Sequence, residues 1–128
     1  AFSPMVPREN IYFCLECKRL NVISGGQFRT LATEYVTEGL IRFISEQYSS
    51  TVQHGGMLGY VLDGKVKQAI QKIIGAIQAR HVELGMEPPG DVQLSSVRPS
   101  DTCVRETHHT RQHNNERFQV HHIFVAGA

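Results

Sequence analysis

Two side chains of opposite charge stand out in IYFCLECKRL (11–20), where Glu16 and Lys18 are separated by a single residue. The segment is rich in β-branched and aromatic residues and has the apolar density of a buried strand. Because side chains alternate between the faces of a strand, Glu16 and Lys18 should share one face with Cys14, opposite Cys17. A carboxylate can bind a divalent cation and a neighbouring ammonium can orient water. The pair therefore has the chemistry for hydrolysing a phosphodiester.

The next part of the chain predicts a helix that would pack near this strand. Apolar residues recur at steps of three and four from Phe28 to Tyr48, which predicts an amphipathic helix. The charged residues that fall between them are Glu34, Glu38, Arg42 and Glu46. NVISGG (21–26) is expected to form a turn before this helix, and SSTVQHGG (49–56) is expected to end it.

A second strand and a second helix follow. MLGYVLDG (57–64) is expected to be a short apolar strand, and Asp63 is placed to cap a helix from about Lys65 to Leu84. Gly85 is a suitable residue to end that helix. Its apolar stripe comprises Val66, Ala69, Ile70, Ile73, Ile74, Ile77, Val82 and Leu84.

The C-terminal part reads as β-structure. DVQLSSV (91–97) is a candidate strand, and residues 104–111 and 117–125 should form an antiparallel hairpin, with Asn114–Asn115 able to adopt positive φ. We therefore expect one domain over residues 1–128, with a strand-helix-strand-helix core at 11–84 and a hairpin region at 91–128. Such an order indicates an α/β fold with at least one parallel strand pair.

Composition narrows the class of protein without choosing a function. An apolar fraction of 41% and a charged fraction of 20% in 128 residues are typical of one globular domain. The formal net charge of +1 neither demands nor excludes nucleic acid, because a charged cleft can be local. No run of eighteen apolar residues and no secretory signal is present, so we expect a cytoplasmic protein without a membrane partner. The missing initiator Met suggests that the chain begins inside a longer protein.

The sequence LECK resembles the E-x-K half of the PD-(D/E)XK signature of restriction-endonuclease-like nucleases. In that family the E-x-K strand is followed by a helix, a strand and another helix, and residues 28–84 have the same predicted order. The resemblance covers residues 11–84. It implies an α/β fold of the restriction-endonuclease-like kind, a mixed central sheet flanked by helices, here lacking its N-terminal elements.

The same resemblance implies a metal-dependent nuclease that cleaves DNA, with RNA as the less favoured substrate. A role in restriction or phage defence is among those open to such a nuclease. Carried over residue by residue, Glu16 would bind Mg²⁺ or Mn²⁺, Lys18 would be the catalytic lysine, and the main-chain carbonyl of Cys17 would be a further metal ligand. Candidate contacts with nucleic acid are Arg19, Arg29, Lys65 and Lys67. A homo-oligomer and a subunit of a larger complex both stay open.

The chain departs from the family pattern in one respect. The family's Asp ligand precedes the E-x-K strand, whereas the acid upstream here is Glu9, seven residues before Glu16. The Asp lies upstream of Ala1, or Glu9 replaces it, or the site is inactive; we favour the first. Some family members also carry an accessory Gln and Tyr on the following helix. Gln27 and Tyr35 are the candidates here, although Gln27 also fits a helix-entry residue and Tyr35 a core residue.

The cysteines and histidines admit other interpretations. Cys14, Cys17 and Cys103 could contribute to a zinc site, but the strand would direct Cys14 and Cys17 to opposite faces, which favours buried thiols packing as small hydrophobic groups. Glu106 and His108, with His121 or His122 opposite, could form a metal cluster. Alternatively, one histidine of each pair, His108–His109 and His121–His122, points to the core and the other to solvent. A third interpretation is a basic, aromatic-rich ribbon that includes Arg105, Arg111 and Arg117 and contacts phosphate or another subunit.

Two functions from other classes therefore stay open beside the nuclease. One is a catalytically inactive nuclease-like module that binds nucleic acid or assembles a larger complex. The other is a small zinc-binding structural domain.

Overall fold

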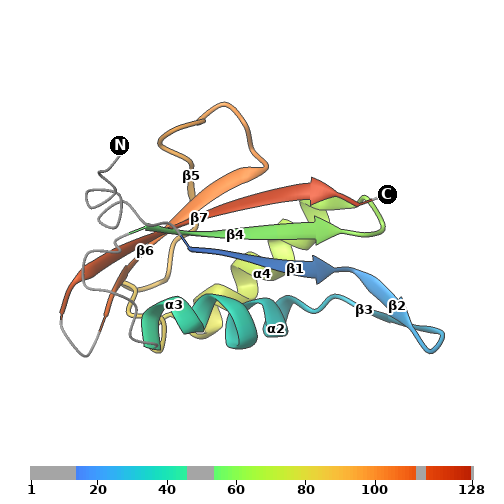
Figure 1. Ribbon diagram of the computed structural model, residues 1–128, viewed down its shortest axis with the longest axis horizontal. Coiled ribbons are helices and arrows are strands. Elements are labelled where there is room, and N and C mark those ends of the chain that lie inside the picture. Colours follow the sequence, from blue (N-terminus) through green and yellow to red (C-terminus); the bar gives the residue numbers. More distant parts are fainter. Residues whose placement is uncertain (1–13, 46–53, 112–114, 128) are drawn as a thin grey trace, which may run out of the picture.

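A five-stranded mixed sheet forms the centre of the computed structural model, which describes residues 14–45, 54–111 and 115–127 (Figure 1). In spatial order its strands are β1 (Cys14–Leu20), β4 (His54–Val61), β7 (Arg117–Ala126), β6 (Val104–Thr110) and β5 (Gln93–Leu94). β1 pairs parallel with β4, and β4 pairs parallel with β7. β6 pairs antiparallel with both β7 and β5. The predicted hairpin and the predicted parallel pairing are confirmed, and the fold is α/β.

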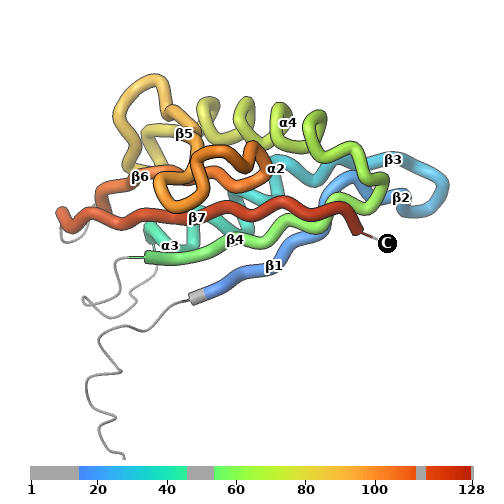
Figure 2. The backbone as a smooth tube through the Cα atoms, turned by 90° about the horizontal axis from the view of Figure 1, so that it is seen from above, coloured from blue at the N-terminus to red at the C-terminus, as the bar shows by residue number. Residues whose placement is uncertain are grey.

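Helices cover one face of this sheet. Three consecutive helical segments lie between β1 and β4: α2 (Ala32–Tyr35), the π-helical η1 (Val36–Leu40) and α3 (Ile41–Ser45). The longer helix α4 (Val66–Ala79) follows β4. Figure 2 shows α2 and α4 on the same side of the sheet. Among the described helices, none has both the length and the apolar character that a transmembrane span requires.

The core lies between these helices and the sheet. Ala69, Ile70, Ile73 and Ile77 are buried on α4 at the helical spacing that the sequence shows. Along β7 every second residue, Phe118, Val120, His122 and Phe124, is buried, as expected for a strand with one covered face. The predicted stripe of the second helix is wrong only at its end, because the chain leaves the helix after Ala79 and Val82 is exposed.

The segment before the first helix differs from the prediction. Residues 21–29 form a small hairpin, with β2 (Val22–Ser24) paired antiparallel to β3 (Gln27–Arg29). Gly25 and Gly26 join the strands with φ of 59° and 79°, a conformation that glycine adopts without a steric penalty. Phe28 therefore stands 56% exposed in a strand, and the helix begins four residues later than predicted. Its predicted end, residues 46–48, lies outside the described residues.

Three other boundaries also differ. β4 starts at His54, so Gly55 and Gly56 belong to the strand that they were expected to precede. Asp63 does not cap α4; its Oδ1 accepts hydrogen bonds from the Lys65 backbone N–H at 3.0 Å and from Asn21 Nδ2 at 2.9 Å. Asp63 thus joins the chain after β1 to the turn after β4. The candidate strand 91–97 is reduced to β5, two residues long.

A chain of buried hydrogen bonds crosses the core. Tyr35 Oη is 2.7 Å from His122 Nδ1, and His122 Nε2 is 2.8 Å from Thr107 Oγ1. Thr107 Oγ1 is also 2.7 Å from His109 Nε2, and His109 Nδ1 is 2.7 Å from the carbonyl oxygen of Leu84. Because that carbonyl can only accept, His109 Nδ1 must carry a hydrogen and its Nε2 must accept one from Thr107. Thr107 in turn accepts from His122 Nε2–H, and His122 Nδ1 accepts from the Tyr35 hydroxyl.

This assignment satisfies every member of the chain only when both histidines are neutral. Burial lowers the pKa of His109 to about 4 and the pKa of His122 to about 3, from an ordinary value of 6.5. Burial also raises the pKa of Tyr35 well above its ordinary value. The network is therefore uncharged at neutral pH.

We expect the free energy of unfolding to fall as the pH drops below 6.5, because the unfolded chain then binds protons that the buried histidines exclude. Both folded pKa values are depressed, so the stabilisation is fully present above pH 6.5 and is lost as the pH falls toward the folded values. At pH 5 each histidine should cost about 2 kcal/mol. Carboxylates titrate mainly below this window. Urea denaturation at several pH values measures the effect, and equal stability at pH 7.5 and pH 5 would contradict it.

Close packing of α3 on the sheet leads to a second prediction. A Cβ at Gly55 would stand 2.6 Å from Phe43 Cε1 and 3.1 Å from Phe118 Cε2, and both rings are buried. Gly55→Ala should therefore destabilise the protein by about 1–3 kcal/mol. The control is Gly75→Ala on the exposed side of α4, where a Cβ meets nothing within 4 Å and should add about 1 kcal/mol of stability. Thermal denaturation measures both effects. Melting temperatures that shift in the same direction for both variants would contradict the packing argument.

Candidate active site

Glu16 and Lys18 lie on the helix-covered side of β1. The Lys18 stem crosses Gly39, where a Cβ would be 3.2 Å from Lys18 Cε. Glu16 Oε2 is 3.8 Å from Arg42 Nη1. Leu20, two residues further along, is buried in the core on the same side. The strand therefore presents Glu16, Lys18 and Leu20 to the helical segment, and Cys17 is exposed.

The helical segment contributes charged groups that the sequence analysis did not include in the site. Glu34, Glu38 and Arg42 recur every four residues and form one row of the helix. Arg42 contacts Glu16, and Gly39 lies against the side chain of Lys18, so the helical segment runs antiparallel to β1. The four-residue spacing was the available signal. Spacing alone does not say which row of the helix faces the strand.

An open cleft of about 740 Å³ lies along this strand and this row. Its described lining consists of Cys17, Lys18, Arg19, Arg29, Leu31, Glu34, Tyr35, Glu38 and Tyr60. The predicted nucleic-acid contacts Arg19 and Arg29 thus join Lys18 at one cleft. Arg29 Nη2 is 3.0 Å from Glu34 Oε2, but both side chains are well exposed, so this ion pair contributes little stability and can exchange for a phosphate.

Glu16 lies beside the cleft rather than in its described lining, and together with Cys17 it fits part of a magnesium shell. Glu16 has a side chain 25% exposed, and its ion pair with Arg42 is long. Leu20 accepts a hydrogen bond from Leu62 on the β4 side, and carbonyls alternate along a strand, so the carbonyl of Cys17 points to the outer edge of β1. Within the described residues no group of three or more His, Cys, Asp or Glu side chains could hold a metal ion by itself. Mg²⁺ commonly uses one or two carboxylates with water and substrate phosphate, which is compatible with Glu16 and Cys17.

Of the remaining described candidates, Tyr35 contributes to the lining of this cleft, whereas Gln27, Lys65 and Lys67 do not. Glu9 lies outside the described residues. Gln27 is exposed on β3, so its interpretation as a helix-entry residue is wrong. Tyr35 is fully buried and hydrogen-bonded to His122, as expected of a core residue. Lys65 and Lys67 line a separate shallow pocket at the start of α4.

Burial of the cysteine thiols was predicted wrongly for Cys17, which is exposed, whereas Cys103 is half-buried. The reason is that Cys17 lies on the face of β1 that none of the described helices covers. The side chain of Cys14 lies outside the described residues.

Among the histidines, the prediction that one of each pair enters the core is confirmed. His109 and His122 are buried, while His108 and His121 lie on the other face of the sheet. The phosphate-contacting role suggested for Arg111 is wrong, because this side chain is 1% exposed. Arg111 Nε donates to the carbonyl of Phe43 at 3.2 Å, and its guanidinium lies 4.3 Å from the centre of the Phe118 ring.

Comparisons with protein-family models, with curated proteins and with solved structures find no match for this chain.

Proposed function

We propose that the chain carries the catalytic part of a metal-dependent nuclease of the restriction-endonuclease-like kind, with Glu16 and Lys18 at its active site. The observation that carries this proposal is the placement of both side chains on one face of a strand, beside an open cleft lined by basic residues. A following helix and a parallel strand, β4, agree with the order that the resemblance implies.

Glu16 and the carbonyl of Cys17 would hold Mg²⁺ or Mn²⁺ in this proposal. When bound, the cation would lower the pKa of a coordinated water and stabilise charge on the phosphate. Arg42 contacts Glu16 through a long, half-exposed ion pair that is worth little. The carboxylate is therefore available to a stronger ligand.

Lys18 is positioned by packing rather than by a loop. Its stem lies against Gly39, and larger residues at position 39 would meet Lys18 and Met57. The ammonium can orient the attacking water or neutralise the charge that builds on the phosphate as the bond to the leaving oxygen breaks. Glu38 lines the same cleft as Lys18 and in this proposal would supply a second carboxylate.

Substrate binding would rest on Arg19 and Arg29, which line the cleft with Lys18. Guanidinium groups bind phosphate through paired hydrogen bonds, and this contact carries no base specificity. DNA is preferred over RNA on the resemblance alone.

The first test is Glu16→Gln in the full-length protein. The variant should lose Mg²⁺-dependent cleavage of DNA, because the amide keeps the volume of the side chain but not its charge. Its melting temperature should change little, since the ion pair with Arg42 is worth at most about 1 kcal/mol. Glu83→Gln, at an exposed carboxylate outside the cleft lining, is the matched control and should cleave normally. Full activity of Glu16→Gln would rule out the assignment. If the wild-type protein bound DNA without cleaving it, the result would instead support the catalytically inactive nuclease-like module.

The second test separates chemistry from binding at Lys18. Lys18→Met keeps an apolar stem over Gly39 and removes the ammonium, so the single-turnover rate should fall by a factor on the order of a hundred. Affinity for DNA with Ca²⁺ in place of Mg²⁺ should hardly change, because one phosphate contact among several carries a small share of binding. Lys72→Met on the exposed face of α4 is the control. A large loss of affinity at an unchanged rate would make Lys18 a docking residue instead.

A further inference from the structure

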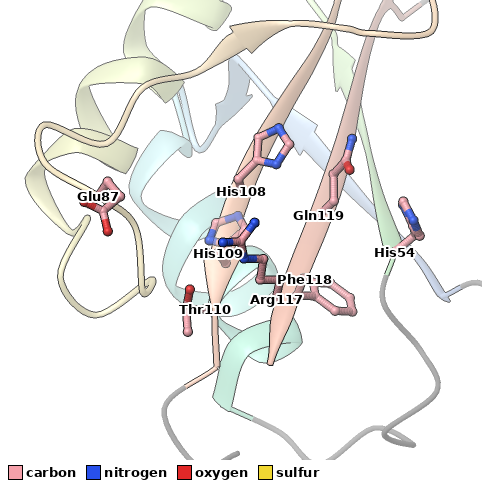
Figure 3. Close-up of a pocket in the computed structure, with 8 residues that line it drawn as sticks. All are labelled: His54, Glu87, His108, His109, Thr110, Arg117, Phe118 and Gln119. Atoms are coloured by element: carbon pink, nitrogen blue, oxygen red, sulfur yellow. The ribbon is translucent and has the colours of Figure 1, made fainter. Parts of the chain in front are cut away.

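Three histidines gather on the sheet face opposite the helices. His54 precedes Gly55, which faces Phe43 of α3, so His54 points to the other face of β4. By the same alternation His121 stands between buried Val120 and His122 on β7, and His108 between buried Thr107 and His109 on β6. Gln119 is the register partner of both His54 and His108. The side chains of His54, Gln119 and His108 therefore form a row across neighbouring strands (Figure 3).

His54 and His121 are in direct contact. His54 Nδ1 is 3.3 Å from His121 Nε2, and the rings are nearly parallel, at 13°. Such a contact needs one N–H and one lone pair, so the two facing nitrogens can share only one hydrogen. Two protonated rings would direct two N–H groups at one another. An acceptor such as an anion, placed between or beside them, would remove that conflict.

His108 is held by a buried carboxylate. Its Nε2 is 2.7 Å from Glu106 Oε2, and Glu106 is 3% exposed. Glu106 Oε1 accepts both the backbone N–H and the hydroxyl of Ser96, each at 2.8 Å. Burial alone would raise the pKa of Glu106, but the hydrogen bonds from Ser96 and His108 lower it below the ordinary value. The carboxylate is thus ionised and engaged, and it fixes the orientation of the His108 ring.

The space beside this row is a hollow of about 540 Å³. His54, His108 and Gln119 line it, together with Arg117, which lies on the same face of β7 two residues before Gln119. Guanidinium, amide and imidazole N–H groups are all hydrogen-bond donors. Donors from three strands therefore converge on one hollow.

The hydrogen-bond donors that line this hollow favour an anion over a cation. The acidic groups near it are Glu106, whose oxygens are already hydrogen-bonded, Glu87 across the hollow, Asp91, which shares a neighbouring pocket with His108, and Asp101, which shares another with His121 and Arg98. The basic groups are Arg117, Arg98 and the three histidines. In the described part of the chain these side chains form no group that could hold a metal ion.

We propose that His54, His108 and His121, with Arg117 and Gln119, form a binding site for a phosphate group. A bound anion favours the imidazolium form of a histidine beside it, so binding should strengthen as the pH falls and be accompanied by net uptake of protons, although burial and the neighbouring His54 lower the pKa of His121. The phosphate belongs to a nucleic-acid strand or to a free phosphate or phosphomonoester. The site lies on the face of the sheet opposite Glu16 and Lys18 and does not depend on their proposed role.

The test uses two probes, an oligothymidylate and inorganic phosphate, titrated into the protein at pH 6 and pH 8. The phosphodiester keeps its charge over this range, so a change in its affinity reports protonation of the protein. NMR of the imidazole rings should show shifts at His54, His108 and His121 at pH 6 with one probe or both. Shifts with the oligonucleotide alone assign the site to a strand, and shifts with inorganic phosphate assign it to a free phosphate or monoester.

Matched variants locate the effect. His54→Gln and, as a second variant, His108→Gln should weaken binding of the active probe at pH 6 by about tenfold or more, the usual scale of a lost charged hydrogen bond. His81→Gln, outside the hollow, should bind as the wild type does. Calorimetry in two buffers of different ionisation enthalpy should detect proton uptake. Unshifted ring resonances with both probes, or equal affinity in the His54 and His81 variants, would overturn the proposal.

Discussion

The hydrogen-bond chain from Tyr35 through His122, Thr107 and His109 to the carbonyl of Leu84 joins four parts of the molecule that are distant in sequence. It connects α2 to β7, β7 to β6, and β6 to the segment after α4. His122, Thr107 and His109 each have one donor and one acceptor in use, and the direction of every hydrogen follows from the fixed carbonyl at the end of the chain. An interior network of this kind tolerates no single replacement by an apolar group without leaving a buried partner unsatisfied. It therefore specifies how the β6–β7 hairpin, α2 and the segment after α4 meet.

The position of the candidate active site follows from that packing. Tyr35 anchors the start of the helical segment against His122, and the row that contains Glu38 and Arg42 then lies over β1. Glycines permit the close approach: Gly39 accommodates Lys18, and Gly55 accommodates the ring of Phe43. The chemistry of the cleft depends on side chains of a strand and a helix whose separation is set by contacts elsewhere in the core.

The two faces of the sheet have different character for the same reason. One face is covered by helices and contains the neutral histidines, Arg111 and the apolar core. The other carries His54, His108 and His121 at one end, and exposed apolar side chains, Tyr60 and Ile123, further along β4 and β7. Alternation along each strand produces this division, because neighbouring residues of one strand must serve opposite faces. Adjacent histidines in the same dipeptide thus have different surroundings.

Local patterns in the sequence determined the order of strand, helix, strand, helix and hairpin, and the shared face of Glu16 and Lys18. Periods of two and of three to four residues are properties of backbone geometry, so they can be read without knowing the partner surface. They also indicated that one histidine of each pair is buried. Tertiary structure alone decided which one, because the partner that His122 finds in Thr107, and the partner that His109 finds in the Leu84 carbonyl, are distant from each histidine in sequence. It also decided that Arg111 is buried against Phe118 and that Arg42 faces Glu16. Each of these outcomes depends on a contact between segments that no local pattern relates, and on the free energy of burying one face of an element rather than the other.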